Sequence, residues 1–177
     1  MEPPVVSSTG GLTSLLLTGA TGAVGRYLLD KLLTIPSFKL YLLVRTPHKL
    51  PLEIQQNPNI QLLVGDLSEL NQWIDILSEI QIAIHLATVW GGERTFEINV
   101  EKTCELFSLL VNCQQVFYFS TASILNAEHQ LVSQSISLGT DYNKSKAICY
   151  QNIQQCSIWN KITVFFKVDT KTASWLA

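Results

Sequence analysis

The chain has 177 residues, of which 47% are hydrophobic and 15% are charged, so it carries enough apolar material for the core of one globular domain. Its 12 basic and 14 acidic side chains nearly balance, and the sequence therefore offers no broad positive surface for nucleic acid or an anionic membrane. The apolar runs are short and interrupted, far from the ~20 residues that span a bilayer.

Residues 1–13 lack the basic start and the unbroken apolar stretch of a signal peptide. We therefore expect an N-terminal leader outside the fold and a cytoplasmic location.

From residue 14 onward, short runs of branched and aromatic residues alternate with longer amphipathic stretches. The runs predict strands at 14–18, 39–44, 60–64, 82–86, 115–120 and 161–166, and the amphipathic stretches predict helices at 24–33, 70–79, 96–112 and 142–157. This alternation is typical of βαβ units, so we expect an α/β fold with a doubly wound parallel sheet between two helical layers. Between the second and third strands, a loop or broken helix is favoured by Pro47, Pro51 and Pro58.

The first predicted strand runs directly into TGATGAVG, residues 18–25, which opens the first predicted helix. Glycines at this spacing let backbone N–H groups approach a pyrophosphate, and the helix N-terminus adds partial positive charge. An ordinary glycine-rich turn is the alternative, but strand, spacing and helix together favour a Rossmann-type domain that binds a dinucleotide. The predicted cofactor contacts here are Thr18, Gly19, Thr21, Gly22, Ala23, Val24 and Gly25.

The end of the second predicted strand carries Arg45, where an NAD-binding unit usually has an acidic residue that accepts hydrogen bonds from the ribose. An arginine there can pair with the 2′-phosphate of NADP, and His48 and Lys49 are near enough in sequence to extend a positive pocket. The sequence therefore favours NADP over NAD, with a merely solvated arginine as the alternative.

Hydroxyl side chains, Thr121 among them, gather at the end of the fifth predicted strand, the edge at which open α/β folds bind ligands. Tyr142 and Lys146 follow, four residues apart and therefore on one face of a predicted helix. The ammonium can stabilise the phenolate, so that the phenol protonates a carbonyl oxygen or, in reverse, deprotonates an alcohol. We expect Tyr142 as acid/base, Lys146 tuning it and Thr121 holding the substrate oxygen; a chance surface pair is the alternative.

In this order, the motifs resemble those of the short-chain dehydrogenase/reductase superfamily, in its extended, epimerase/dehydratase-like branch, over residues 15–164. Gly65-Asp66-Leu67 resembles the step that contacts adenine, His85-Leu86-Ala87 the segment after the fourth strand, and Asn99-Val100 the opening of the next helix. The resemblance implies a nicotinamide beside Tyr142 and a Lys146 that also contacts the ribose hydroxyls. The cofactor contacts that it implies are Asp66, Leu67, Leu86, Ala87, Thr88, Asn99, Tyr142 and Lys146.

Two segments depart from the resemblance. Residues 120–126 read STASILN and lack the Tyr-Gly that often follows in this branch. After residue 166, such proteins continue into a Pro-containing loop and a substrate-binding lobe, whereas this chain ends at Ala177. We therefore expect a leader at 1–13, a cofactor-binding domain at 14–166 and a divergent tail at 167–177, the altered terminus of a truncated or frame-shifted reading frame.

These features favour an NAD(P)-dependent oxidoreductase or epimerase-like enzyme that acts on a small carbonyl or alcohol compound. The short C-terminus leaves open a dinucleotide-binding module without catalysis. A sugar-nucleotide- or RNA-binding relative is the weaker third alternative, because no basic patch with interleaved aromatic residues supports it. Homo-oligomers would be favoured if an absent lobe uncovers the aromatic residues near the end, which are Trp159, Phe165, Phe166 and Trp175.

The four cysteines form no CxxC pair and have no histidine at metal-ligand spacing. We expect no metal site, and buried free thiols at Cys104, Cys113, Cys149 and Cys156.

Overall fold

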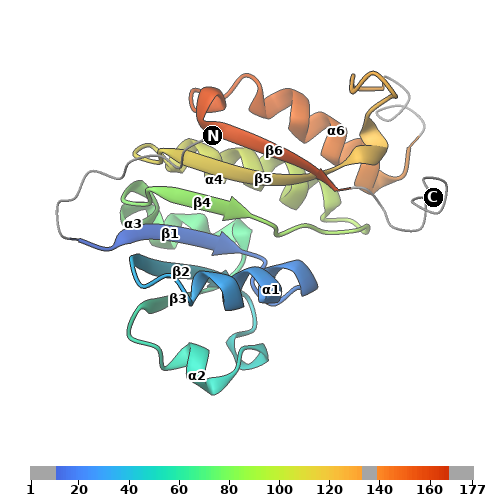
Figure 1. Ribbon diagram of the computed structural model, residues 1–177. Helices are drawn as coiled ribbons and strands as arrows, with labels where there is room; N and C mark the ends of the chain where they lie inside the picture. Colours follow the sequence, from blue (N-terminus) through green and yellow to red (C-terminus); the bar gives the residue numbers. More distant parts are fainter. Residues whose placement is uncertain (1–10, 133–138, 168–177) are drawn as a thin grey trace, which may run out of the picture.

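Six parallel strands form one sheet in the computed structural model, which describes residues 11–132 and 139–167 (Figure 1). In chain order they are β1 (Thr13–Thr18), β2 (Phe38–Val44), β3 (Ile60–Val64), β4 (Ile82–His85), β5 (Gln115–Thr121) and β6 (Ile162–Lys167). Across the sheet they lie in the order β3-β2-β1-β4-β5-β6. The first three strands therefore extend from β1 toward one edge of the sheet, and the last three extend from β4 toward the other edge. The strand order therefore reverses between β1 and β4, as in the doubly wound sheet that the sequence predicts.

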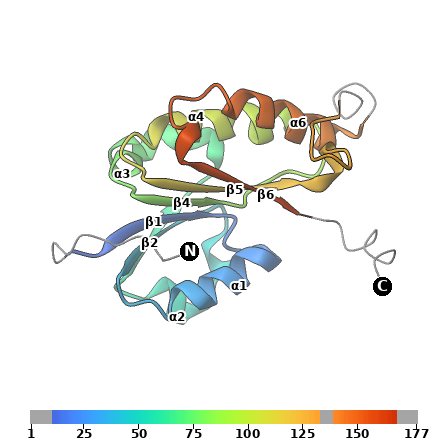
Figure 2. The same cartoon turned by 45° about the horizontal axis from the view of Figure 1, so that its top comes forward.

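Helices cover both faces of this sheet (Figure 2). One face carries α1 (Ala23–Leu32) and α2 (Leu52–Gln55), and the other carries α3 (Ile74–Ser78), α4 (Thr103–Leu109) and α6 (Asp141–Ile153). Alternate residues of β1 supply both cores: Leu15 and Leu17 belong to the cluster that includes Leu29 of α1, while Leu16 belongs to the cluster that includes Phe107 of α4. A strand buried on both faces is apolar throughout, which is why its sequence shows no alternation. The predicted three-layer α/β fold is confirmed.

The helical layers are more broken than the amphipathic pattern predicts. Instead of a helix over 70–79, 3₁₀ turns at Leu67–Trp73 precede α3, because a capping box starts the segment early: the Asp66 carboxylate accepts from the Ser68 N–H at 3.1 Å, and the Glu69 carboxylate accepts from the Asp66 N–H at 2.9 Å. The helix predicted at 96–112 begins with a π-helical segment, Glu97–Lys102, that leads into α4. Wide turns of this kind occur frequently at functional sites.

The connection between β2 and β3 is the broken helix that the prolines predict. A 3₁₀ turn at Pro47–Lys49 is followed by the single turn of α2, which begins directly after Pro51. Two more 3₁₀ turns, Ala122–Ile124 and Trp159–Lys161, flank α6 on either side in the sequence.

The predicted leader and tail lie mostly outside the described residues, at 1–10 and 168–177. Where the structure describes their inner ends, β1 starts at Thr13 and β6 ends at Lys167. No helix among the described residues is long and apolar enough to cross a membrane.

A buried histidine connects the sheet to the helical layer. His85, 1% exposed, has Nδ1 2.8 Å from Thr18 Oγ1 and Nε2 3.1 Å from Thr103 Oγ1. The Thr103 hydroxyl donates to the Ile98 carbonyl oxygen at 3.0 Å, so it accepts from Nε2–H, and Nδ1 then accepts from the Thr18 hydroxyl. The neutral imidazole therefore satisfies both threonines. Burial, together with the nearby charge of Lys146, lowers the pKa of His85 to about 3.

This buried histidine predicts acid-sensitive folding. The unfolded chain protonates His85 near its ordinary pKa of about 6.5, whereas the folded protein protonates it only near pH 3. Between these values the unfolded state binds more protons, so the free energy of unfolding falls as the pH drops, by up to about 5 kcal/mol from this group.

Urea unfolding of the wild type and of His85→Gln at two pH values measures this effect. At neutral pH the variant should be less stable, by roughly 1–3 kcal/mol, because it disturbs a buried hydrogen-bond network. At pH values near 4.5 the gap should narrow markedly, because the variant lacks the proton-linked loss. A gap that does not change with pH would show that the folded protein protonates His85 normally.

Candidate cofactor and active site

A pocket of about 570 Å³ opens at the carboxyl ends of the strands. The loops after β1, β2, β3 and β4, the end of β5 and the start of α6 all contribute to its wall. Open α/β folds bind ligands at this edge, where the strand order reverses. Most of the predicted site residues line this one pocket, namely Thr18, Gly19, Thr21, Gly22, Ala23, Val24, Gly25, Arg45, Asp66, Leu67, Leu86, Ala87, Thr88, Tyr142 and Lys146, whereas Asn99 and Thr121 do not.

The glycine loop presents backbone to the pocket. Gly19 has a φ of +74°, and a Cβ added there would lie 2.9 Å from the backbone nitrogen of Ala87. A Cβ at Gly25 would overlap the carbonyl oxygen of Gly19. Glycine is thus required at the first position for the backbone conformation and at the second for the close packing of α1 on the loop.

The same loop leaves the N-terminus of α1 available to a ligand. Gly22 is the N-cap of this helix, and no described side chain caps it. The first N–H groups of α1 therefore have no intrahelical partner, and their residues, Ala23 and Val24, line the pocket. Such a helix end attracts anions such as a pyrophosphate.

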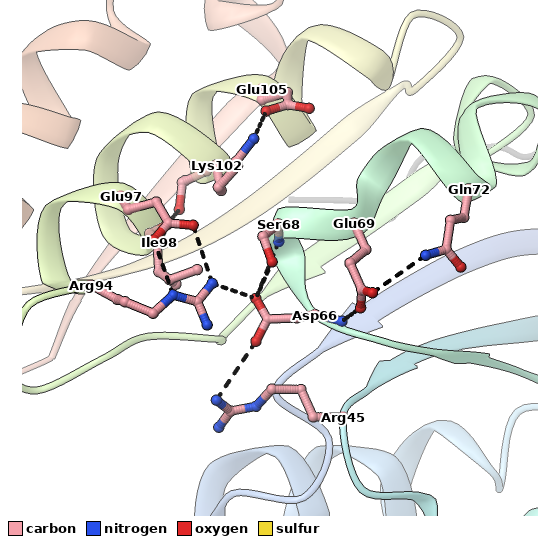
Figure 3. Close-up of polar contacts among 11 residues, drawn as sticks. Arg45, Asp66, Ser68, Glu69, Gln72, Arg94, Glu97, Ile98, Lys102 and Glu105 are labelled. Atoms are coloured by element: carbon pink, nitrogen blue, oxygen red, sulfur yellow. Dashed lines mark hydrogen bonds and ion pairs between the residues drawn. The ribbon is translucent and has the colours of Figure 1, made fainter.

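Asp66 lies between two arginines at another part of the wall (Figure 3). Its Oδ1 accepts from the Ser68 N–H at 3.1 Å and from Nη2 of Arg94 at 3.3 Å, and its Oδ2 lies 3.8 Å from Nη1 of Arg45. Partial burial raises the pKa of Asp66, but the hydrogen bonds from Ser68 and the charges of Arg94 and Arg45 outweigh it, so that the pKa lies below its ordinary value. Asp66 is therefore a carboxylate at neutral pH, and Arg45, 72% exposed, is accessible to a ligand.

Asn99 does not line the pocket but is hydrogen-bonded to residues that form its wall. The side chain is 1% exposed, and its Oδ1 accepts from the Val89 N–H at 2.8 Å and from the Thr88 hydroxyl at 3.1 Å. Its Nδ2 donates to the Val89 carbonyl oxygen at 2.7 Å and to the Ser145 hydroxyl at 3.0 Å. Asn99 thus fastens the loop after β4 to α6 without lining the pocket itself.

Tyr142 and Lys146 enter the pocket from the first two turns of α6. Thr140 caps this helix by accepting from the Asn143 N–H at 3.3 Å, and the helix brings the two side chains to one face, as predicted. Lys146 Nζ lies 5.9 Å from the centre of the Tyr142 ring. The indole of Trp90 stacks on the same ring, with centroids 4.4 Å apart and planes inclined by 23°.

The ammonium of Lys146 is nearly completely buried. The side chain is 2% exposed, and Nζ donates to the Phe119 carbonyl oxygen at 3.1 Å and to the Tyr118 hydroxyl at 3.4 Å. Burial lowers the pKa of Lys146 to about 8, because a charged ammonium is poorly solvated there. The group can therefore change its protonation state near physiological pH.

Of the two hydroxyl residues at the end of β5, Ser120 lines the pocket, whereas Thr121, which was expected to hold the substrate oxygen, does not. Thr121 Oγ1 lies 2.8 Å from Ser123 Oγ, and Thr121 is not part of the pocket wall. Its neighbour Ser120 is part of it, and among the described residues Ser120 Oγ is the buried side-chain oxygen that has no hydrogen-bond partner. Successive side chains of a strand point to opposite faces of the sheet, so only one of the neighbours Ser120 and Thr121 can face a ligand in the pocket.

Sequence patterns did not indicate Trp90 or Arg94 as parts of the wall, and among the hydroxyl residues at the end of β5 they favoured Thr121 over Ser120. The first two lie in the loop after β4, which has no periodicity, and their contacts depend on the fold of that loop. The three-residue spacing of Arg94 and Glu97 could have predicted an ion pair on a helical turn. In the structure, Arg94 Nε lies 3.0 Å from Glu97 Oε2.

Several solved structures share this fold. The chain is similar to a short-chain dehydrogenase/reductase superfamily protein from Agrobacterium tumefaciens with bound NAD, with a TM-score of 0.66 and 17% identity over 86% of this chain and 48% of that one. It is similar to DesIV, a dTDP-glucose 4,6-dehydratase from Streptomyces venezuelae with NAD and TYD bound, with a TM-score of 0.70 and 17% identity over 88% of this chain and 55% of that one. For UDP-glucuronic acid 4-epimerase from Bacillus cereus in complex with NAD, the TM-score is 0.70 and the identity 16%, over 88% of this chain and 57% of that one.

The chain spans about half the length of these structures. Among curated proteins, none has significant sequence similarity to it.

The model of the NAD dependent epimerase/dehydratase family matches residues 15–160. This match includes the glycine loop, Asp66 and the pair of Tyr142 and Lys146. Fold and family together support a nicotinamide dinucleotide as the cofactor. The chain belongs to the NAD dependent epimerase/dehydratase family.

Proposed function

We propose that this chain binds NADP in the pocket at the carboxyl ends of the strands and uses Tyr142 and Lys146 for hydride transfer with a carbonyl or alcohol substrate. The observation that carries the proposal is the meeting, in one pocket, of the glycine loop, Arg45 and the pair of Tyr142 and Lys146. Each of these groups matches a different part of the same ligand: pyrophosphate, 2′-phosphate and nicotinamide riboside.

The pocket fits such a cofactor on local grounds. Gly19 and Gly25 leave the backbone uncovered where a Cβ would block it, and the uncapped start of α1 offers N–H groups to the pyrophosphate. Asp66 Oδ2 can accept from the adenine amino group, while the exposed guanidinium of Arg45 can pair with the 2′-phosphate.

When bound, the nicotinamide supplies or accepts the hydride. Tyr142 gives its phenolic proton to the carbonyl oxygen in the reducing direction and takes it back from the alcohol in the reverse direction. The ammonium of Lys146 stabilises the phenolate that this transfer leaves and can donate to the ribose hydroxyls. Trp90 holds the Tyr142 ring by stacking and shields one of its faces from water.

A second candidate function is a dinucleotide-binding module without catalysis. The position of Thr121 favours it, because the residue expected to hold the substrate oxygen bonds with Ser123 and does not line the pocket. In the catalytic proposal, Ser120 takes the role of Thr121 as the hydroxyl beside the substrate.

Titration with NADPH and NADH tests the cofactor, with quenching of tryptophan emission and energy transfer to the reduced nicotinamide as the signals. Trp90 in the pocket wall is a local reporter. Arg45→Gln should weaken NADPH binding by about tenfold, the equivalent of one charge-assisted hydrogen bond, and leave NADH binding nearly unchanged. Lys31→Gln, in the last turn of α1, is the control and should change neither. Equal losses for both dinucleotides in Arg45→Gln would contradict the NADP assignment.

The lowered pKa of Lys146 predicts pH-dependent cofactor binding. If the anionic dinucleotide binds the protonated ammonium, the Kd for NADPH should be nearly constant between about pH 7 and pH 8 and rise above pH 8, by at most about tenfold per pH unit. Lys146→Arg should remove this rise, since a guanidinium keeps its charge in this range. An unchanged pH profile in the variant would assign the effect to another group.

Substitution of the phenol separates the two candidate functions. Tyr142→Phe should bind NADPH within about twofold of the wild type, yet reduce aldehydes and ketones at least about 100-fold more slowly, the usual range for a lost general acid. NADPH oxidation with a panel of these carbonyl compounds is the measurement. A wild type that binds NADPH tightly but reduces no compound would favour the non-catalytic module, and full activity of the variant would exclude Tyr142 as the acid.

A further inference from the structure

Four alternating charges meet at the end of the pocket that holds Asp66 (Figure 3). Arg94 reaches Asp66 with Nη2, at 3.3 Å from Oδ1, and also grips both carboxylate oxygens of Glu97, with Nε 3.0 Å from Oε2 and Nη2 3.1 Å from Oε1. Arg45 approaches the other oxygen of Asp66 at 3.8 Å. Arg45, Asp66 and Arg94 line the pocket, whereas Glu97 lies outside its wall.

This arrangement bears on the binding of a 2′-phosphate. A phosphate oxygen hydrogen-bonded to Nη1 of Arg45 would lie within roughly 7 Å of the Asp66 carboxylate, given the 3.8 Å between Nη1 and Asp66 Oδ2 and about 2.8 Å for the new bond. Two anions at that distance repel each other, and the repulsion is only partly screened at physiological salt. An NAD adenosine, which lacks the phosphate, would not experience it.

Arg94 supplies the charge that offsets this repulsion. With Arg94 in place, the pocket-lining groups at this end carry one net positive charge, from two arginines and one carboxylate. Without it, Arg45 and Asp66 cancel, and the carboxylate of Glu97 loses its partner close by. This difference in net charge affects almost only a ligand that carries a charge next to Asp66, such as a dinucleotide with a 2′-phosphate.

We propose that Arg94 is a specificity-determining residue that favours a 2′-phosphorylated dinucleotide by neutralising Asp66. The inference rests on the proposed dinucleotide site, but it concerns a residue beyond those that contact the phosphate. Asp66 keeps Oδ2 for the adenine, and Arg45 is left to bind the phosphate because Arg94 is the closer partner of Asp66. The two hydrogen bonds that Arg94 donates to Glu97, the first residue of the π-helical segment, hold its guanidinium in place.

The test is the ratio of the Kd for NADH to the Kd for NADPH, measured for the wild type and Arg94→Gln at low and at high salt. Arg94→Gln should lower this ratio by roughly 5- to 20-fold at low salt, through weaker NADPH binding, with NADH binding changed less than about twofold. Because Arg94 is half-exposed, the effect should shrink at high salt. Arg94→Lys, which keeps the charge, should retain most of the ratio.

Lys102→Gln is the matched control. It removes one positive charge from the π-helical segment that follows Arg94, where Lys102 pairs with Glu105 at 2.7 Å outside the pocket wall, and should leave the ratio unchanged. An Arg94→Gln variant with an unaltered ratio, or with equal losses for both dinucleotides at every salt concentration, would overturn the inference. The wild-type ratio tests the proposed NADP preference separately: a wild type that prefers NADH contradicts the preference, while the change caused by Arg94→Gln still decides the role of Arg94. Failure of the wild type to bind either dinucleotide would overturn both.

Discussion

The contact between the loop after β1 and the segment after β4 determines where the pocket lies. Gly19 approaches the backbone of Ala87 so closely that no Cβ fits between them. Beside this contact, the Thr18 hydroxyl accepts from the N–H groups of Leu86 and Ala87, both at 3.2 Å, while it donates to His85. The strands β1 and β4 are neighbours at the point where the strand order reverses. These contacts therefore keep their carboxyl ends aligned and position the start of α1 next to them. A side chain at Gly19 would separate the helix N-terminus from the edge at which it can meet a phosphate.

The positive charges of the pocket have unlike surroundings. The guanidinium groups of Arg45 and Arg94 are 72% and 49% exposed, so water screens them and each ion pair is weak. Lys146 is buried, and its ammonium has carbonyl and hydroxyl partners but no carboxylate among its described hydrogen bonds. A buried charge of this kind is costly until a ligand supplies further acceptors. In the proposed function, the exposed arginines therefore select the dinucleotide, whereas Lys146 serves the reaction.

Much of this architecture is predictable from the sequence, and the exceptions have physical reasons. The strands were predictable because each is a short run rich in branched, leucine or aromatic residues, and the glycine loop because sterics allow no other residue at Gly19 and Gly25. The 3₁₀ turns at Leu67–Trp73 were not, because the Asp66 capping box outweighs the amphipathic pattern that follows it. Trp90 and Arg94 could not be placed because their contacts come from a loop without periodicity. At the end of β5, Ser120 and Thr121 are both hydroxyl residues, so composition cannot show which one faces the pocket.

Asn99 shows how a position can tolerate little change without meeting a ligand. Its amide group uses all four of its hydrogen-bonding positions, on Thr88, Val89 and Ser145, and Ser145 in turn donates to the Tyr142 carbonyl oxygen at 2.8 Å. Aspartate has the same shape but no N–H, and glutamine has the same groups on a longer arm, so neither can replace it without loss. Few substitutions at position 99 should therefore be tolerated, for reasons of geometry alone. A mutational scan would show Asn99 to be as sensitive to substitution as the residues that contact a ligand.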